Sequence, residues 1–208
     1  MDMDKGEQVR NAILKLESLG YTMPAPQVFD LADFGVPQHR NRFILVGSRT
    51  GQIFKFPARQ RNHVPCLRVF EKKIESAPNH ETREHKAESL IRYARLEYGK
   101  RDKLGRVDRL NPAKPSKTVI AGGMKGGGRS HLHPFIPRTL SVRESARLQT
   151  FPDWYIFTGA VARQFTQVGN AVPPLFAYKL AVEIQKQFFG TEEQPLSGFS
   201  PVQQKLSI

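Results

Sequence analysis

Arg40 and Arg42 are the residues of this 208-residue chain whose type and spacing first suggest chemistry. They stand in the run G-V-P-Q-H-R-N-R-F-I-L-V-G, which spans residues 35–47. Side chains at positions i and i+2 of an extended segment project from the same face. The two guanidiniums therefore predict a paired grip on a phosphate or a carbonyl oxygen. The structural alternative is a pair at a strand edge that forms salt bridges with Asp30 or Asp33.

A glycine-rich segment, residues 122–129, carries a second pair of cations, Lys125 and Arg129. Its backbone N–H groups could cradle a phosphate, but it lacks the G-x-x-x-x-G-K-[ST] pattern of a nucleotide-binding loop. We expect a loop that adapts to a DNA groove through these two cations; an ordinary surface loop is the alternative. His131 and His133 form an isolated H-x-H pair, so no metal site is predicted.

The elements that position these residues can be read in part from apolar spacing. Residues 7–19 have a helical pattern followed by Gly20, a typical C-terminal cap. Val28 and Phe29 indicate a short extended segment. Phe43–Val46 is apolar on both faces, as is typical of a strand in the middle of an α/β sheet. Since such a sheet usually has about five strands, this end of the chain predicts only part of one.

The middle and the last third of the chain show further elements. We expect a helix over residues 84–98 and a strand over residues 118–120. Ser141 and Glu144 fit a capping box at the start of a helix, which should end near Gln149, before a proline.

A longer helix is expected over residues 174–189, begun by a proline and ended by Gly190. Residues 167–173 are expected to form a loop that leads into it. Arg143 and Glu144, on the preceding short helix, are adjacent and point in different directions, so we expect each to form a fixed ion pair.

Charge is concentrated in one part of the chain. There are 32 Lys and Arg residues against 19 Asp and Glu, and residues 51–138 carry twenty of the basic and eight of the acidic ones, or +12 of the net +13. A basic segment between two nearly neutral ones favours a polyanionic partner. The single cysteine excludes a disulfide framework and favours a reducing cytoplasm. No apolar run approaches the length of a membrane span.

Three blocks, taken together and in this order, resemble the last three conserved blocks of the cytosine-C5 DNA methyltransferases. They are G-V-P-Q-x-R-x-R-F from residue 35, R-T-L-S-V-R-E-S-A-R-L-Q-T-F-P over 138–152, and Q-V-G-N-A-V-P-P over 167–174. The resemblance implies an α/β fold, a partial doubly wound (Rossmann-like) methyltransferase sheet interrupted by a small basic target-recognition lobe. Its parts would be scaffold over 1–49, target-recognition region over 50–137, returning scaffold over 138–190 and a tail over 191–208.

The resemblance also implies roles for single residues. Arg42 would contact the flipped-out cytosine, and Arg40 would support it by holding local structure. Asn170, Ala171 and Val172 would line the pocket for S-adenosylmethionine.

The catalytic blocks of the family, F-x-G-x-G, Pro-Cys-Gln and Glu-Asn-Val, are not found in the sequence. Their place would be before Gly35, where only 34 residues stand. Cys66 follows a proline, but Leu67 replaces the expected glutamine and the pair comes after the arginine block. We therefore interpret Cys66 as a small hydrophobic residue rather than as the thiolate that attacks cytosine.

These observations predict the C-terminal part or second subunit of a DNA (cytosine-5-)-methyltransferase that is inactive alone. Its partners would be double-stranded DNA and a complementary chain that carries the catalytic Pro-Cys and the glycine-rich cofactor block. Restriction–modification is the usual setting of this family. A truncated fragment and a stand-alone DNA-binding remnant are the alternatives.

Overall fold

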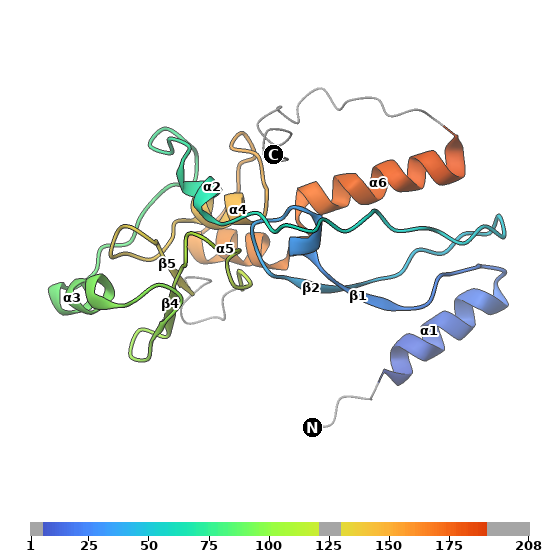
Figure 1. Cartoon of the computed structure of the whole chain (residues 1–208), viewed down its shortest axis with the longest axis horizontal. Coiled ribbons are helices and arrows are strands. Elements are labelled where there is room, and N and C mark those ends of the chain that lie inside the picture. The colour runs from blue at the N-terminus through green and yellow to red at the C-terminus, as the bar shows by residue number, and fades with distance from the viewer. Residues whose placement is uncertain (1–5, 121–129, 191–208) are drawn as a thin grey trace.

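Two small sheets organise the computed structural model, which describes residues 6–120 and 130–190 (Figure 1). In the first, β1 (Gln27–Asp30) pairs antiparallel with β2 (Asn41–Ile44). In the second, β4 (Val107–Arg109) lies between β3 (Arg101–Asp102), antiparallel to it, and β5 (His131–Leu132), parallel to it. The chain is therefore α/β, and each sheet belongs to a different end of the molecule.

The first sheet is covered on one side by two helical segments. The 3-10 helix η1 (Leu31–Phe34) connects β1 to the residues before β2, and α6 (Pro174–Phe189) packs on η1. Between them lies an apolar core formed by Phe29, Leu31, Phe34, Val36 and Phe176. Helix α1 (Glu7–Ser18) precedes this sheet and has no buried residue.

The middle of the molecule is a small helical layer. Helices α2 (Leu67–Phe70), α4 (Val142–Leu148) and α5 (Val161–Asn170) pack together there (Figure 1). Their core brings together residues distant in sequence: Cys66, Val69, Leu110, Val119, Leu140, Val142, Ala146, Leu148, Phe157, Phe165 and Val168. At the far end, α3 (Ala87–Arg95) covers the second sheet through Tyr93, which packs with Val107 and Leu132.

Several predicted elements are confirmed. The first helix, the extended segment at β1, the capping box and the long last helix all form, and the last spans residues 174–189 as predicted. Gly20 and Gly190 both adopt the left-handed conformation that ends a helix. The helix expected over 84–98 forms only over the residues of α3.

Three predictions are wrong. The strand expected over 43–46 is β2, which begins at Asn41 and pairs with β1 alone among the described residues, so Phe43 is 43% exposed rather than buried in mid-sheet. Residues 118–120 form no strand, because side chains rather than a neighbouring strand bind the backbone of Val119. Residues 167–170 form the last turn of α5, not a loop.

Candidate functional site

Gln38 and Arg40 point into the core between the first sheet and the helical layer, while His39 between them faces outward. Both inward side chains are essentially unexposed. Gln38 accepts a hydrogen bond from the Val119 N–H at 2.7 Å and donates one to the Leu148 carbonyl at 3.3 Å. Arg40 donates to the Val119 carbonyl at 3.0 Å and to the Gly169 carbonyl. These two side chains therefore join four separate segments of the chain at one point.

The charge of Arg40 has no carboxylate partner among the described residues. Its guanidinium binds two carbonyl oxygens, and its Nε has no acceptor within the described part of the chain. Burial and, to a smaller extent, the like charge of Arg42 together lower the pKa of Arg40 to about 10. Because removing a charge from water is costly, this position must be held by the packing around it. The expectation that Arg40 holds local structure is consistent with this geometry.

Arg42 is placed differently from Arg40. Its side chain is partly exposed and, among the described residues, donates a hydrogen bond to the neighbouring Asn41 carbonyl alone, at 2.7 Å. The two arginines thus do not share one acceptor within the described residues, and the salt bridges with Asp30 or Asp33 that the structural alternative required do not form there. Arg42 remains available to a bound molecule.

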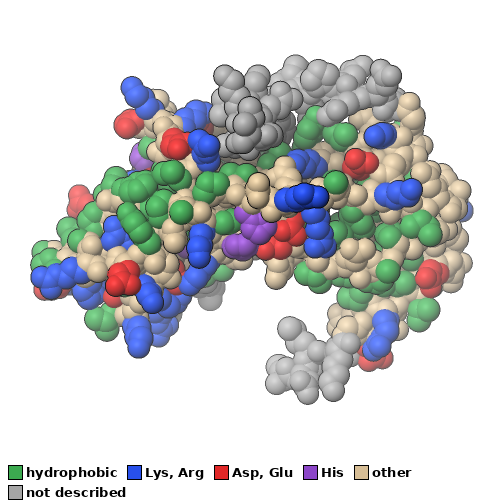
Figure 2. Space-filling view, viewed as in Figure 1, with side chains coloured by type: hydrophobic (Ala, Val, Ile, Leu, Met, Phe, Trp, Pro, Cys, Tyr) green, Lys and Arg blue, Asp and Glu red, His purple; other side chains and the backbone are tan. Residues whose placement is uncertain are grey.

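The aspartates have histidine partners instead, which the sequence did not indicate. Asp30 lies 2.7 Å from His39, and Asp33 lies 2.9 Å from His63, with the two imidazole rings 5.3 Å apart. Figure 2 shows histidine and acidic side chains gathered in the hollow between the two ends of the molecule. Burial opposes ionisation of Asp30, but His39 and two backbone N–H groups hold its pKa below the ordinary value. No spacing rule would find these pairs, since Asp30–His39 depends on the turn between β1 and β2, and Asp33–His63 depends on the segment after β2 returning to that turn.

The junction of α5 and α6 brings the third sequence block beside the first. Gly169 is buried and its carbonyl accepts from Arg40, whereas Asn170 is exposed at the end of α5. Ala171 turns the chain into extended conformation, and Val172 is 44% exposed. An amide and an apolar side chain therefore face outward next to a rigid internal contact. This arrangement suits one wall of a small-molecule site.

The other residues singled out in the sequence are Lys125, Arg129 and Cys66. Lys125 and Arg129 lie outside the described residues. Cys66 is buried, its thiol donates to the Asn111 carbonyl at 3.2 Å, and burial raises its pKa to about 12. A thiol in that state is a poor nucleophile. In residues 6–120 and 130–190, no three His, Cys, Asp or Glu side chains are grouped to hold a metal ion, and no helix is long and apolar enough to cross a bilayer.

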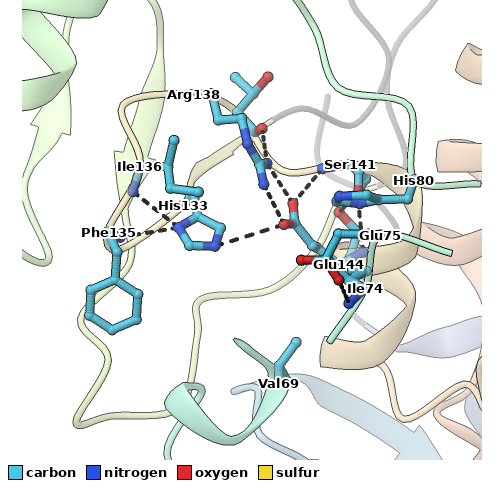
Figure 3. A network of polar contacts seen from close by, with 12 residues as sticks. Val69, Ile74, Glu75, His80, His133, Phe135, Ile136, Arg138, Ser141 and Glu144 are labelled. Carbon is cyan, nitrogen blue, oxygen red and sulfur yellow. Dashed lines mark hydrogen bonds and ion pairs between the residues drawn. The ribbon is translucent and has the colours of Figure 1, made fainter. Parts of the chain in front are cut away.

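Polar contacts at the start of α4 join this helix to residues 133–141, as Figure 3 shows. Ser141 and Glu144 form the predicted capping box, and Arg138 donates to both Glu144 carboxylate oxygens, at 2.8 and 2.7 Å. Burial opposes ionisation of Glu144, yet Arg138 and the Ser141 N–H hold its pKa below the ordinary value. The ion pair expected for Glu144 is thus present.

Arg143 departs from the expectation of an ion pair. Its guanidinium donates to backbone carbonyls, those of Pro78 and Pro152 at 2.9 Å each and that of Tyr155, and to the Asn79 side-chain oxygen. It fixes the loops on both sides of α4 by hydrogen bonds alone. Burial lowers its pKa.

Comparison with known proteins identifies a family whose model matches most of the chain. A family model for the C-5 cytosine-specific DNA methylases matches residues 1–186. Type II methyltransferase M.BbvI of Brevibacillus brevis is 34% identical over 208 residues, covering 90% of this chain and 54% of that protein. Type II methyltransferase M1.HphI of Haemophilus parahaemolyticus is 33% identical, covering 83% of this chain and 50% of that protein. The chain thus spans about half the length of these relatives.

Solved structures show the same fold at lower identity. The crystal structure of a proposed DNA modification methyltransferase encoded in an E. coli prophage superposes with a TM-score of 0.73 at 21% identity, covering 89% of this chain and 66% of that one. The S. pombe Dnmt2 methyltransferase superposes with a TM-score of 0.59 at 12% identity, covering 91% and 64%.

Proposed function

Because this chain belongs to the C-5 cytosine-specific DNA methylase family, we propose that it acts as the C-terminal part or second subunit of a DNA (cytosine-5-)-methyltransferase. It would supply target recognition and part of the S-adenosylmethionine pocket. The observation that carries the proposal is the contact of Arg40 with Gly169, which holds the arginine block against the last block although 129 residues separate them. Two blocks that serve one reaction should meet in this way.

Within that enzyme, Arg42 is the residue that would contact the flipped-out cytosine. Its guanidinium is partly exposed and makes a single local hydrogen bond, so it can turn to a ligand without breaking the core. Arg40 would act as a positioning residue, since its donors are used inside the protein. The guanidinium of Arg42 would then stabilise negative charge that develops on the base.

The exposed side chains at the α5–α6 junction fit one wall of the cofactor pocket. Asn170 offers an amide, and Ala171 and Val172 offer apolar surface at the start of the proline-led helix. S-adenosylmethionine would supply the methyl group when bound there. The glycine-rich block that forms the opposite wall in the family would come from a complementary chain or from a longer form of this one.

The nucleophilic cysteine of the family would also come from a complementary chain or from a longer form of this one. Cys66 is buried and its thiol has a raised pKa, so we propose that this chain alone is inactive. Unpartnered apolar surface supports a complementary chain: α1 buries no residue, and Val28 and Phe43 are 61% and 43% exposed on one face of the first sheet. Val28 and Phe43 are direct neighbours across the strand pair, and adjoining exposed apolar side chains can mark an interface.

DNA is the proposed macromolecular partner. The surplus of positive charge over 51–138, together with Lys125 and Arg129, supports a target-recognition region there. The relatives are named as Type II methyltransferases, so a role in restriction–modification and DNA methylation is the setting we propose. The same positive charge favours the second candidate, a stand-alone DNA-binding protein.

The experiment that tests the proposal measures transfer of labelled methyl groups from S-adenosylmethionine to duplex DNA. This chain is assayed alone, with a chain carrying F-x-G-x-G, Pro-Cys-Gln and Glu-Asn-Val blocks, and with a Cys→Ser variant of that second chain. We expect activity only in the mixture with an intact cysteine. Activity of this chain alone would refute the division of labour, and site-selective DNA binding without activity in any mixture would favour the stand-alone DNA-binding protein.

A further inference from the structure

The hairpin formed by β3 and β4 carries an apolar tip between cations. Leu104, in the turn, is 79% exposed, the largest value among the exposed large hydrophobic side chains of the described chain. Lys103 and Arg106 flank it and are also exposed. The turn projects beyond β4 at the α3 end of the molecule (Figure 1), where Lys and Arg side chains gather on the surface (Figure 2).

This tip is held in a fixed shape. The Gly105 N–H donates to the Asp102 carboxylate at 2.7 Å, and Asp102 is buried beside Arg92 of α3. A Cβ on Gly105 would lie 2.6 Å from that carboxylate and 2.8 Å from the Tyr93 hydroxyl. Arg106 has a φ of 53°, an unusual conformation for a residue with a side chain. Strain of this kind is commonly kept at functional positions.

The acidic residues of the hairpin are turned inward and neutralised. Asp108 lies 2.7 Å from both Arg101 and Lys117 and is buried. In the described residues, neither Lys103 nor Arg106 has an ion-pair partner. The outward surface of the tip therefore combines unpaired positive charge with one large apolar side chain. Such a surface suits a polyanion that also offers apolar groups.

We propose that the β3–β4 hairpin is a DNA-contacting element that enters the major groove of duplex DNA, with Lys103 and Arg106 on phosphates and Leu104 against apolar groups of the base edges. A two-stranded ribbon fits the major groove of B-form DNA, about 12 Å wide. The major groove of A-form RNA is too deep and narrow for it. The inference rests on the proposed role in DNA recognition and adds an element distinct from the segment of Lys125 and Arg129.

The test measures the affinity of the full chain for duplex DNA by fluorescence anisotropy over a range of salt concentrations. The double variant Lys103→Gln/Arg106→Gln should bind more weakly and lower the log–log salt slope by about 2, because each phosphate contact contributes about 0.9. The matched control, Arg163→Gln/Lys186→Gln, removes the same charge from exposed positions on α5 and α6 and should keep the slope.

Leu104→Ala tests the apolar contact. We expect it to weaken binding to DNA about fivefold or more at constant salt slope, whereas Ile156→Ala, at a residue 63% exposed elsewhere, should have no effect. Circular dichroism should be unchanged for every variant, since all the altered side chains are exposed.

The outcomes separate the hairpin from the proposed function. If the unsubstituted chain binds DNA and the hairpin variants bind equally well, the hairpin inference is refuted while DNA recognition stands. An equal loss of DNA affinity in the control double variant would show that the effect follows from net charge alone. Equal affinity of the unsubstituted chain for duplex RNA would exclude the major-groove geometry. Absence of DNA binding by the unsubstituted chain would refute the recognition role itself, and the hairpin inference with it.

Discussion

At the scale of residues, the side chains of Gln38, His39 and Arg40 alternate between the core and the surface. Gln38 and Arg40 are buried and bind backbone groups of distant segments, and His39 faces outward to Asp30. Arg42, two residues after Arg40, is partly exposed. Two arginines with the same chemistry thus meet different surroundings, and this difference determines what each substitution should do.

Arg40→Met should lower the free energy of unfolding by about 2–4 kcal/mol, because the carbonyls of Val119 and Gly169 would lose their buried donor. Arg42→Ala should change it by less than about 0.5 kcal/mol, since Arg42 binds only a neighbouring carbonyl. Urea unfolding of the chain measures both. Equal effects of the two substitutions would contradict the division between them.

Arg42→Ala should, however, lower the turnover of the reconstituted methyltransferase by about 100-fold or more, as loss of a donor to developing charge does. Arg49→Ala, an exposed arginine after β2, is the matched control and should be nearly silent. Methyl transfer is compared with sedimentation of the mixed chains, so that loss of assembly is seen separately. Near-normal turnover of the Arg42 variant would remove it from the site.

At the scale of elements, local signals predicted the helices well. The capping box of α4 and the proline-to-glycine bounds of α6 are properties of a few adjacent residues, and both form as expected. The strand predicted around Val119 does not form, because the backbone groups of Val119 are bound by Gln38 and Arg40, which lie about 80 positions away in the sequence. The end of α5 was mistaken for a loop since its glycine and asparagine are turn formers, whereas Phe165 and Val168 pack that helix into the core.

The segment between β5 and α4 should give the fold an acid-sensitive contribution to stability. His133 is buried, and its Nδ1 accepts hydrogen bonds from the N–H groups of Phe135 and Ile136, at 3.1 Å each (Figure 3). Burial lowers its pKa to about 4, although Glu144 acts in the opposite direction. As the pH falls below about 6.5, the unfolded chain takes up a proton that the folded chain refuses, so stability decreases until about pH 4.

His133→Asn should remove that contribution, because the asparagine oxygen can still accept from the same N–H groups. The loss of unfolding free energy between pH 7 and pH 5 should become smaller by about 2 kcal/mol. Glu144 changes the unfolding free energy little between pH 7 and pH 5. Because its pKa is lowered, its stabilising contribution is lost only in stronger acid. Ser141→Ala is the comparison: it should cost about 1 kcal/mol at both pH values without changing the difference. Urea unfolding at the two pH values measures this difference in unfolding free energy. If the His133→Asn variant shows the same difference as the unsubstituted chain, His133 is not the source of the acid sensitivity.

At the scale of the whole molecule, the two ends differ in what they leave open. The end with the second sheet exposes cations around a rigid hairpin. The end with the first sheet exposes apolar surface, since β1 and β2 pair only with each other among the described residues and α1 packs no side chain into a core. The sequence indicated an incomplete sheet because this end of the chain offers few strands, but it did not show which side chains face outward, because that depends on the pairing of β1 with β2. The two surfaces fit the two proposed partners, DNA and a complementary chain.

The apolar surface gives the last prediction. Val28 and Phe43 are directly opposite each other across the β1–β2 pair, on the face away from the buried Phe29. Val28→Thr/Phe43→Thr keeps residues that favour strands but removes apolar area that the complementary chain would cover. The two substitutions should remove about 2 kcal/mol of the binding free energy that comes from apolar burial between the chains. The concentration of the complementary chain needed for half-maximal methyl transfer should therefore rise about 30-fold.

Ile91→Thr/Ile156→Thr is the matched control, because it removes similarly exposed side chains, 52% and 63%, from α3 and from the loop before α5. It should leave activation unchanged. Circular dichroism of each variant alone verifies that the chain still folds, and activation is titrated with the complementary chain at fixed DNA and S-adenosylmethionine. If the sheet variant is activated at the same concentration as the control, the complementary chain does not bind this face. The exposed pair would then be an ordinary feature of a two-stranded sheet, and the exposed apolar side chains of α1 would be the next surface to test for assembly.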